Sequence, residues 1–120
     1  MADIRDIIRQ SAERRGVPLG FMMRTAGIES RFDPNAYNKS GAAGLYQVIP
    51  STGRQYGLTN PYDPAANADV AAQLARDNQA HLRRSLGREP TEAELYLAHQ
   101  QGAAGATKIL SNPNGRAVDT

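Results

Sequence analysis

Apolar side chains recur at helical spacing near the start of the chain. Four of them fall on one face of a helix: Ile4, Ile7, Ile8 and Ala12. Gly16 follows them, and glycine is the residue that most often ends a helix. A second apolar stretch starts at Pro18, where the first turn of a helix accepts proline, and continues to Ser30. The pattern therefore predicts two helices before residue 31.

The segment from Arg31 to Thr59 loses this periodicity because glycine and proline interrupt it, and we expect loops and short helical pieces there. Asp63-Pro64 then opens a long alanine-rich helix that runs to about Leu86.

Two shorter helices are predicted after the long one. Thr91 and Glu94 have the spacing of a capping box, so a helix is expected to continue to Gln101. Residues 103–110 predict a last helix. Apolar and polar residues never alternate over the length of a strand, so little or no sheet is expected. The prediction is an all-α single domain of about six helices.

Composition narrows the class of protein. The chain has 120 residues, no cysteine and a formal net charge of +2. Its length fits one domain, and the lack of cysteine excludes disulfides and thiol chemistry. No apolar run approaches the ~20 residues that span a bilayer. The arginines are spread along the chain, which is more typical of solvated helix faces than of a nucleic-acid surface.

The sequence predicts no metal site and no cofactor. Neither His81 nor His99 belongs to a metal-binding pattern, and no phosphate-binding loop is present.

Residues 1–110 are predicted to form the domain, and residues 111–120 a linker-like tail. The sequence Ser-Asn-Pro-Asn-Gly at 111–115 is typical of a turn-rich linker. The tail is either a natural C-terminus or the point at which a domain was cut from a longer protein.

Glu29 is the first candidate for chemistry. It ends an apolar helical stretch and directly precedes the glycine-rich segment, so its carboxyl group is expected to be half-buried. Burial and the partial negative charge of a helix C-terminus both favour the protonated carboxyl, which is the form that a general acid needs. The alternative is a surface glutamate paired with Arg24 or Arg31.

Short motifs follow Glu29 at fixed spacing. In chain order they are Glu29-Ser30, Pro34-Asn35-Ala36, Ser40-Gly41-Ala42, Gly44-Leu45-Tyr46-Gln47 and Ile49-Pro50-Ser51-Thr52. This series resembles the catalytic signature of the soluble-lytic-transglycosylase (SLT) domain, a lysozyme-like family. The resemblance covers about residues 4–110 and implies a lysozyme-like domain with a substrate cleft. Tyr46 stands where the family usually has methionine, and it is expected to alter a sugar contact without loss of activity.

The resemblance implies that Glu29 is catalytic and that matched residues bind substrate. Those in the first two-thirds of the chain are Ser30, Ser40, Gly44, Tyr46 and Gln47. Ser30 either orients Glu29 and its loop or only closes the helix end. Gly44 permits close approach of the backbone to a sugar, although turn geometry would also explain it. Gln47 can donate and accept hydrogen bonds with a hydroxyl or N-acetyl group. Two further motif residues are expected in the core: Leu45 and Ile49.

The family's third motif, Ala-Tyr-Asn-x-Gly, is altered in this chain. His99 and Gln100 stand in the places of the tyrosine and the asparagine. Tyr96 lies on the same helical face, three and four positions earlier, and is expected to supply the missing phenol. All three are candidate substrate contacts. His99 contacts substrate, helps to hold Glu29, or is a hydrogen-bonded core histidine.

The resemblance implies a peptidoglycan lytic transglycosylase, which cleaves the β-1,4 bond between N-acetylmuramic acid and N-acetylglucosamine and leaves a 1,6-anhydro end. Glycosidases usually need two carboxyl groups, yet no Asp or Glu lies between Pro34 and Tyr62. Three alternatives remain: a hydrolytic muramidase of the same fold that uses Asp63 or Asp69, a non-catalytic glycan-binding module of a virion protein, and a nucleic-acid-binding helical domain.

The expected partner is the glycan strand of peptidoglycan, bound by a monomeric domain that neither binds nucleic acid nor inserts into a membrane. Such a domain acts in the periplasm or cell wall. The charged first residues do not resemble a signal peptide. Delivery by a phage is therefore expected, either within a virion protein or as an endolysin released through a holin.

Overall fold

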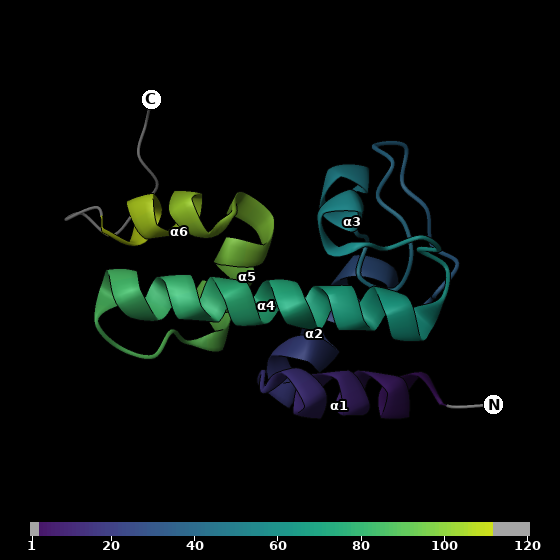
Figure 1. Ribbon diagram of the computed structural model, residues 1–120, viewed down its shortest axis with the longest axis horizontal. Helices are drawn as coiled ribbons and strands as arrows, with labels where there is room; N and C mark the ends of the chain where they lie inside the picture. The colour runs from purple at the N-terminus through teal and green to yellow at the C-terminus, as the bar shows by residue number, and fades with distance from the viewer. Residues whose placement is uncertain (1–2, 112–120) are drawn as a thin grey trace. The chain divides into compact units, whose positions relative to one another are not determined.

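The computed structural model describes residues 3–111 of the chain. Within that range the secondary structure consists of α-helices joined by loops, without a strand (Figure 1). The helices are α1 (Ile4–Arg15), α2 (Leu19–Ser30), α3 (Pro50–Tyr56), α4 (Pro64–Leu86), α5 (Glu92–Gln101) and α6 (Ala103–Leu110). The prediction of an all-α fold with about six helices is confirmed.

The described residues of Met1–Gln73 form one compact unit, and those of Leu74–Thr120 form a second. The division falls within α4, so this helix belongs to both units. The motif residues from Glu29 to Thr52 lie in the first unit. The altered third motif lies in the second.

Helix α1 ends where its sequence predicts. Gly16 adopts a left-handed conformation with φ 67°, and its N–H and that of Val17 bond back to carbonyls of the last turn. Helix α1 packs against α2. The first unit buries apolar side chains from both helices and from the loop that follows: Ile8, Val17, Phe21, Met22, Leu45 and Tyr46.

An ion pair joins α1 to the start of α4. Arg15 donates from Nε and Nη2 to the two carboxylate oxygens of Asp69, at 2.9 and 2.8 Å. Arg14 adds a longer bond from Nε to Oδ1, at 3.4 Å. The two-bond geometry matches the planar guanidinium to the planar carboxylate, which is the strongest form of this pair. Asp69 therefore fixes α4 against α1.

The second unit is built on α5 and α6, which pack against each other. The capping box predicted at the start of α5 is present, since Thr91 Oγ1 accepts from Glu94 N and the Glu94 carboxylate accepts from Thr91 N. Leu82, Leu95, Ala98 and Ala106 are its most buried apolar side chains.

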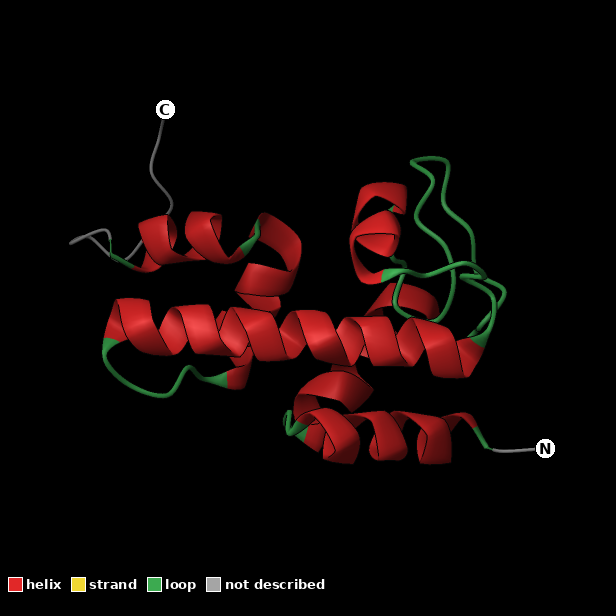
Figure 2. Cartoon of the chain, in the orientation of Figure 1, coloured by secondary structure: helices red, strands yellow, loops and turns green. Residues whose placement is uncertain are grey.

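A long loop connects α2 to α3, and Figure 2 shows it as the longest non-helical segment of the described chain. Two isolated antiparallel bridges shape it, between Tyr37 and Ala43 and between Ala43 and Val48. Leu45 is buried as expected, but the prediction that Ile49 belongs to the core is wrong, because its side chain is 48% exposed. No helix among residues 3–111 is long and apolar enough to cross a bilayer.

Candidate functional site

Glu29 lies in the last turn of α2 and is half-buried, as its sequence context predicts. The helix ends just after it in an uncommon way. Arg31 and Phe32 both adopt left-handed backbone conformations, with φ 56° and 63°. Such angles are strained for residues other than glycine, and strain of this kind is concentrated at functional sites.

Packing around Phe32 holds the strained turn in place. The Phe32 ring lies against Gly27, where a β-carbon would stand 3.3 Å from the ring. The guanidinium of Arg5 lies over the ring, 5.6 Å from its centre. The N–H groups of Arg31 and Phe32 also bond to carbonyls of Gly27 and Ala26. Glu29 is therefore presented from a helix end with a fixed geometry.

Ser30 connects this helix end to the loop. Its hydroxyl makes a 2.7 Å bond to the carbonyl oxygen of Leu45 and lies 3.2 Å from that of Ala26. Of the two roles expected for Ser30, the loop-holding one matches these contacts, because one partner lies 15 residues away in the chain. Ser30 is thus engaged by the protein's own backbone.

The loop that receives this bond is a tight turn. Ala43 and Val48 exchange two backbone hydrogen bonds of 3.2 and 3.0 Å and enclose the four residues between them. Gln47 adopts φ 51° in this turn. Its side-chain Nε2 donates to the carbonyls of Ala36 and Gly44, at 3.1 and 2.9 Å. Gln47 therefore braces the loop with the amide nitrogen that was expected to reach a sugar.

Tyr46 is buried within the protein, which contradicts the expectation that its side chain contacts sugar. Its side chain is 1% exposed, and its hydroxyl donates to the carbonyl of Met22 at 2.7 Å. Burial raises the pKa of the Tyr46 phenol, so it remains a protonated donor. The large apolar ring fills the core, and the hydroxyl finds a partner on α2.

Gly44 is needed for packing within the protein. It is buried at φ 85°, and a β-carbon would collide with the Pro61 carbonyl and the Asn67 side chain. These contacts match the turn-geometry alternative for Gly44, and the close approach to a sugar stays a prediction.

Ser40 is exposed in the turn that precedes this loop. Its N–H donates to Asn38 Oδ1 at 3.0 Å, and its hydroxyl accepts weakly from Ala42 N at 3.5 Å. Ser40 remains available as a polar surface contact.

Asn67 was missed by the sequence analysis, although it organises the loop. It is fully buried on α4, accepts from Tyr46 N at 2.8 Å, and donates to the carbonyls of Ala43 and Pro61 at 3.1 and 3.0 Å. The available signal was an asparagine among the alanines at the start of the long helix, where a buried amide needs specific partners.

The candidate residues of the second unit share one face of α5, as their spacing predicts. The rings of Tyr96 and His99 are stacked with their centres 6.0 Å apart. Gln100 donates from Nε2 to the Tyr96 hydroxyl at 3.1 Å. All three form a continuous polar and aromatic surface.

The two aspartates considered as a second catalytic carboxylate, Asp63 and Asp69, have structural partners, as does Asp33 close to Glu29 in the sequence. Asp33 accepts from Asn35 N, and Asp63 accepts from Ala65 N in the first turn of α4. The Arg15 guanidinium holds the pKa of Asp69 below its usual range. Within residues 3–111, no three His, Asp or Glu side chains lie close enough to form a metal site.

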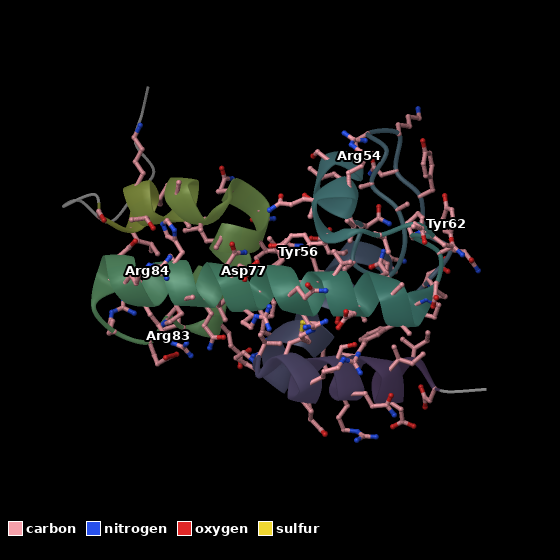
Figure 3. All side chains as sticks on the ribbon, viewed as in Figure 1. Arg54, Tyr56, Tyr62, Asp77, Arg83 and Arg84 are labelled. Carbon is pink, nitrogen blue, oxygen red and sulfur yellow. The ribbon has the colours of Figure 1, made fainter. Side chains whose placement is uncertain are left out.

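A pocket of about 230 Å³ lies between the loop and α3. Its walls are mostly apolar, and Arg54 stands on its lining with an exposed side chain (Figure 3). The lining residues come from the motif loop, from α3 and from the segment before α4: Gly41, Ala43, Val48, Ile49, Pro50, Gly53, Arg54, Leu58 and Pro61.

Comparison with known protein families adds to these structural observations. Residues 6–117 match the family described as the Transglycosylase SLT domain. The chain belongs to this family.

Individual relatives bear related names. The chain is 40% identical over 65 residues to the membrane-bound lytic murein transglycosylase D of Escherichia coli K12, a match that covers 54% of this chain and 14% of the relative. It is 28% identical to the membrane-bound lytic murein transglycosylase C of Edwardsiella ictaluri, over 95% of this chain and 35% of the relative. It is 26% identical to the peptidoglycan transglycosylase gp16 of Escherichia phage T7, over 95% of this chain and 9% of the relative. The chain therefore spans about a third or less of each of these proteins.

Proposed function

We propose that this domain is a peptidoglycan lytic transglycosylase that cleaves the β-1,4 bond between N-acetylmuramic acid and N-acetylglucosamine. The observation that carries the proposal is the half-buried Glu29 at the left-handed end of α2, joined through Ser30 to the loop of a chain that belongs to the SLT family. Membership of the family supports the reaction class, and the contacts of Phe32 and Ser30 support a defined backbone position for Glu29.

In the proposed mechanism, Glu29 acts first as an acid and then as a base. Its protonated carboxyl donates to the glycosidic oxygen, and the bond from that oxygen to the anomeric carbon of the muramic sugar breaks. The resulting carboxylate takes the proton of the C6 hydroxyl of the same sugar. The C6 oxygen then bonds to the anomeric carbon and closes the 1,6-anhydro ring, so Glu29 is again protonated.

A single carboxyl group is sufficient for this route. The nucleophile belongs to the substrate, and an intramolecular group has a high effective concentration. Hydrolysis would instead require a second carboxylate to activate water or to attack the sugar. The aspartates nearest in sequence do not fit that role well, because Asp33 and Asp63 accept turn and helix-start N–H groups and Asp69 is paired with Arg15.

Substrate contacts form a second part of the proposal. Ser40 in the first unit and the Tyr96, His99 and Gln100 face in the second are proposed to bind sugar, through hydroxyl and amide hydrogen bonds and through aromatic rings. Arg54 is proposed to attract carboxylates of the peptide stems that glycan strands carry, because its positive charge stands beside an apolar pocket that suits an alanine methyl group.

The test is the chemistry of the product. Sacculi are digested with the domain in water enriched in oxygen-18, and the fragments are analysed by mass spectrometry. We expect anhydro-muropeptides without added label. Reducing ends that carry oxygen-18 would show hydrolysis and overturn the proposal. Folded Glu29→Gln is expected to be inactive, and a folded protein that binds glycan but cleaves nothing would identify a binding module.

We further propose that a phage supplies this domain, as part of a larger virion protein and monomeric in itself. Support comes from the T7 relative, which matches along 95% of this chain. Peptide mass spectrometry of purified particles would detect the domain in the virion. Its presence only in the lysed culture, and not in particles, would show an endolysin instead.

A further inference from the structure

Asn67 lies outside the motifs named above, at a junction between the motif loop and α4. It is fully buried in the second turn of α4, yet all three of its side-chain hydrogen bonds leave the helix. One reaches the N–H of Tyr46 and one the carbonyl of Ala43, so the amide closes around the turn that contains Gly44 and Leu45. The third reaches Pro61, which precedes α4.

Gly44 shows how close this contact is. A β-carbon at position 44 would overlap both the Asn67 amide and the Pro61 carbonyl. The backbone of the turn therefore lies directly against the asparagine, without an intervening side chain. Only glycine at 44 allows that approach, and only a short amide at 67 can bond to donors and acceptors on both sides of it.

The turn that Asn67 contacts on one side is also hydrogen-bonded to α2. Leu45 accepts from the hydroxyl of Ser30, the residue after Glu29, and the Tyr46 hydroxyl donates to Met22 in the same helix. A continuous path of hydrogen bonds thus runs from Asn67 through the turn to the end of α2. Each step is 2.7 to 3.1 Å long.

We propose that Asn67 is a positioning residue for Glu29, acting through the turn and Ser30. This inference rests on the proposed function, because it assigns Asn67 a part in the reaction that Glu29 performs. Loss of the amide releases the turn at Tyr46 and Ala43, so the Leu45 carbonyl no longer fixes Ser30. A small displacement of a catalytic group lowers the rate of chemistry more than it lowers binding.

The experiment compares Asn67→Ala with Asn78→Ala in the full chain. Asn78 is also a buried asparagine of α4, but it lies in the second unit and makes no bond to the turn. At a temperature where both variants are folded, we expect Asn67→Ala to lower kcat about ten- to hundredfold with KM little changed. Asn78→Ala is expected to keep kcat near that of the unchanged chain. Equal losses of kcat in the two variants would overturn the proposal.

Amide hydrogen exchange, measured by nuclear magnetic resonance on the unchanged chain, is a second test that requires neither an activity assay nor a folded variant. In the unchanged chain, the Tyr46 amide is expected to exchange with solvent far more slowly than the Ser40 amide, which lies in an exposed turn. Equal exchange would also overturn the proposal. An active Glu29→Gln together with a protected Tyr46 amide would instead reject the proposed function and leave the Asn67 contacts intact.

Discussion

The hydroxyl of Ser30 donates a 2.7 Å hydrogen bond to the carbonyl of Leu45 and so joins the residue beside Glu29 to the centre of the motif loop. Two motifs that are separated in the sequence are one structural unit at this bond. It explains why a Glu-Ser pair and a Gly-Leu-x-Gln turn occur together: the serine needs a carbonyl, and the turn presents one.

The first prediction concerns this bond. Ser30→Ala is expected to lower kcat about tenfold, because Glu29 loses the support of the turn, and to reduce the free energy of unfolding by about 1 kcal/mol. Ser85→Ala is the control, since it removes a hydroxyl from an exposed position of α4. Kinetics on sacculi and urea denaturation measure the two effects. An unchanged kcat in Ser30→Ala would show that the bond serves stability alone.

The second prediction concerns Tyr46. Tyr46→Phe removes the hydrogen bond from the buried phenol to the Met22 carbonyl, which keeps its partner within the helix, so the free energy of unfolding is expected to fall by about 1 kcal/mol. KM for glycan is expected to stay the same, because the ring is buried. Urea denaturation and steady-state kinetics provide the comparison. A raised KM together with an unchanged free energy of unfolding would instead support the sugar contact that the sequence predicted for Tyr46.

Sequence patterns predicted the helices well because the signals are local. Gly16 ends α1 and the Thr91–Glu94 box starts α5 through contacts within a few residues, which spacing alone reveals. The Tyr96 face of α5 follows for the same reason.

Local spacing could not predict which residues of the motif loop are buried and which are exposed. Tyr46 and Gly44 pack against partners more than fifteen residues away, Met22 and Asn67, so their burial depends on the fold. A motif match shows that residues matter together, but it does not distinguish those that touch substrate from those that hold the loop. Ile49 is the opposite case, an apolar motif residue that remains exposed beside the pocket.

The third prediction separates the proposed reaction from hydrolysis. Asp69→Asn removes the charge that pairs with Arg15, so stability is expected to fall, while anhydro products continue to form. The measurement is the product distribution under conditions where the variant is folded. Asp63→Asn, whose amide oxygen can still accept from Ala65 N, is also expected to leave anhydro products as the outcome. A folded variant of either kind that loses all activity would support the hydrolytic alternative.

The fourth prediction concerns acid stability. Two hydrogen bonds from Arg88, together with one from the Thr91 backbone N–H at the cap, lower the pKa of Glu94 to about 2. The folded pKa is depressed, so this carboxylate contributes its full stabilisation above the unfolded value of about 4.3 and loses it as pH falls toward about 2. The difference in free energy of unfolding between the unchanged chain and Glu94→Gln should therefore shrink between about pH 4 and pH 2. A difference that stays constant over that interval would contradict the assignment.

The last prediction tests Arg54 and the pocket beside it. If the guanidinium attracts peptide carboxylates, its loss should matter only when peptides are present. Arg54→Gln is therefore expected to lower kcat/KM on intact sacculi about tenfold, by analogy with the loss of one charge-assisted hydrogen bond. On glycan strands whose peptide stems have been removed by an amidase, the same variant should match the unchanged chain. Arg84→Gln is the control, because it removes an equal charge from an exposed arginine of α4 (Figure 3). If Arg54→Gln lowers kcat/KM equally on both substrates, Arg54 acts on the glycan and not on the peptide. If Arg54→Gln and Arg84→Gln lower kcat/KM equally, the effect comes from the net charge alone.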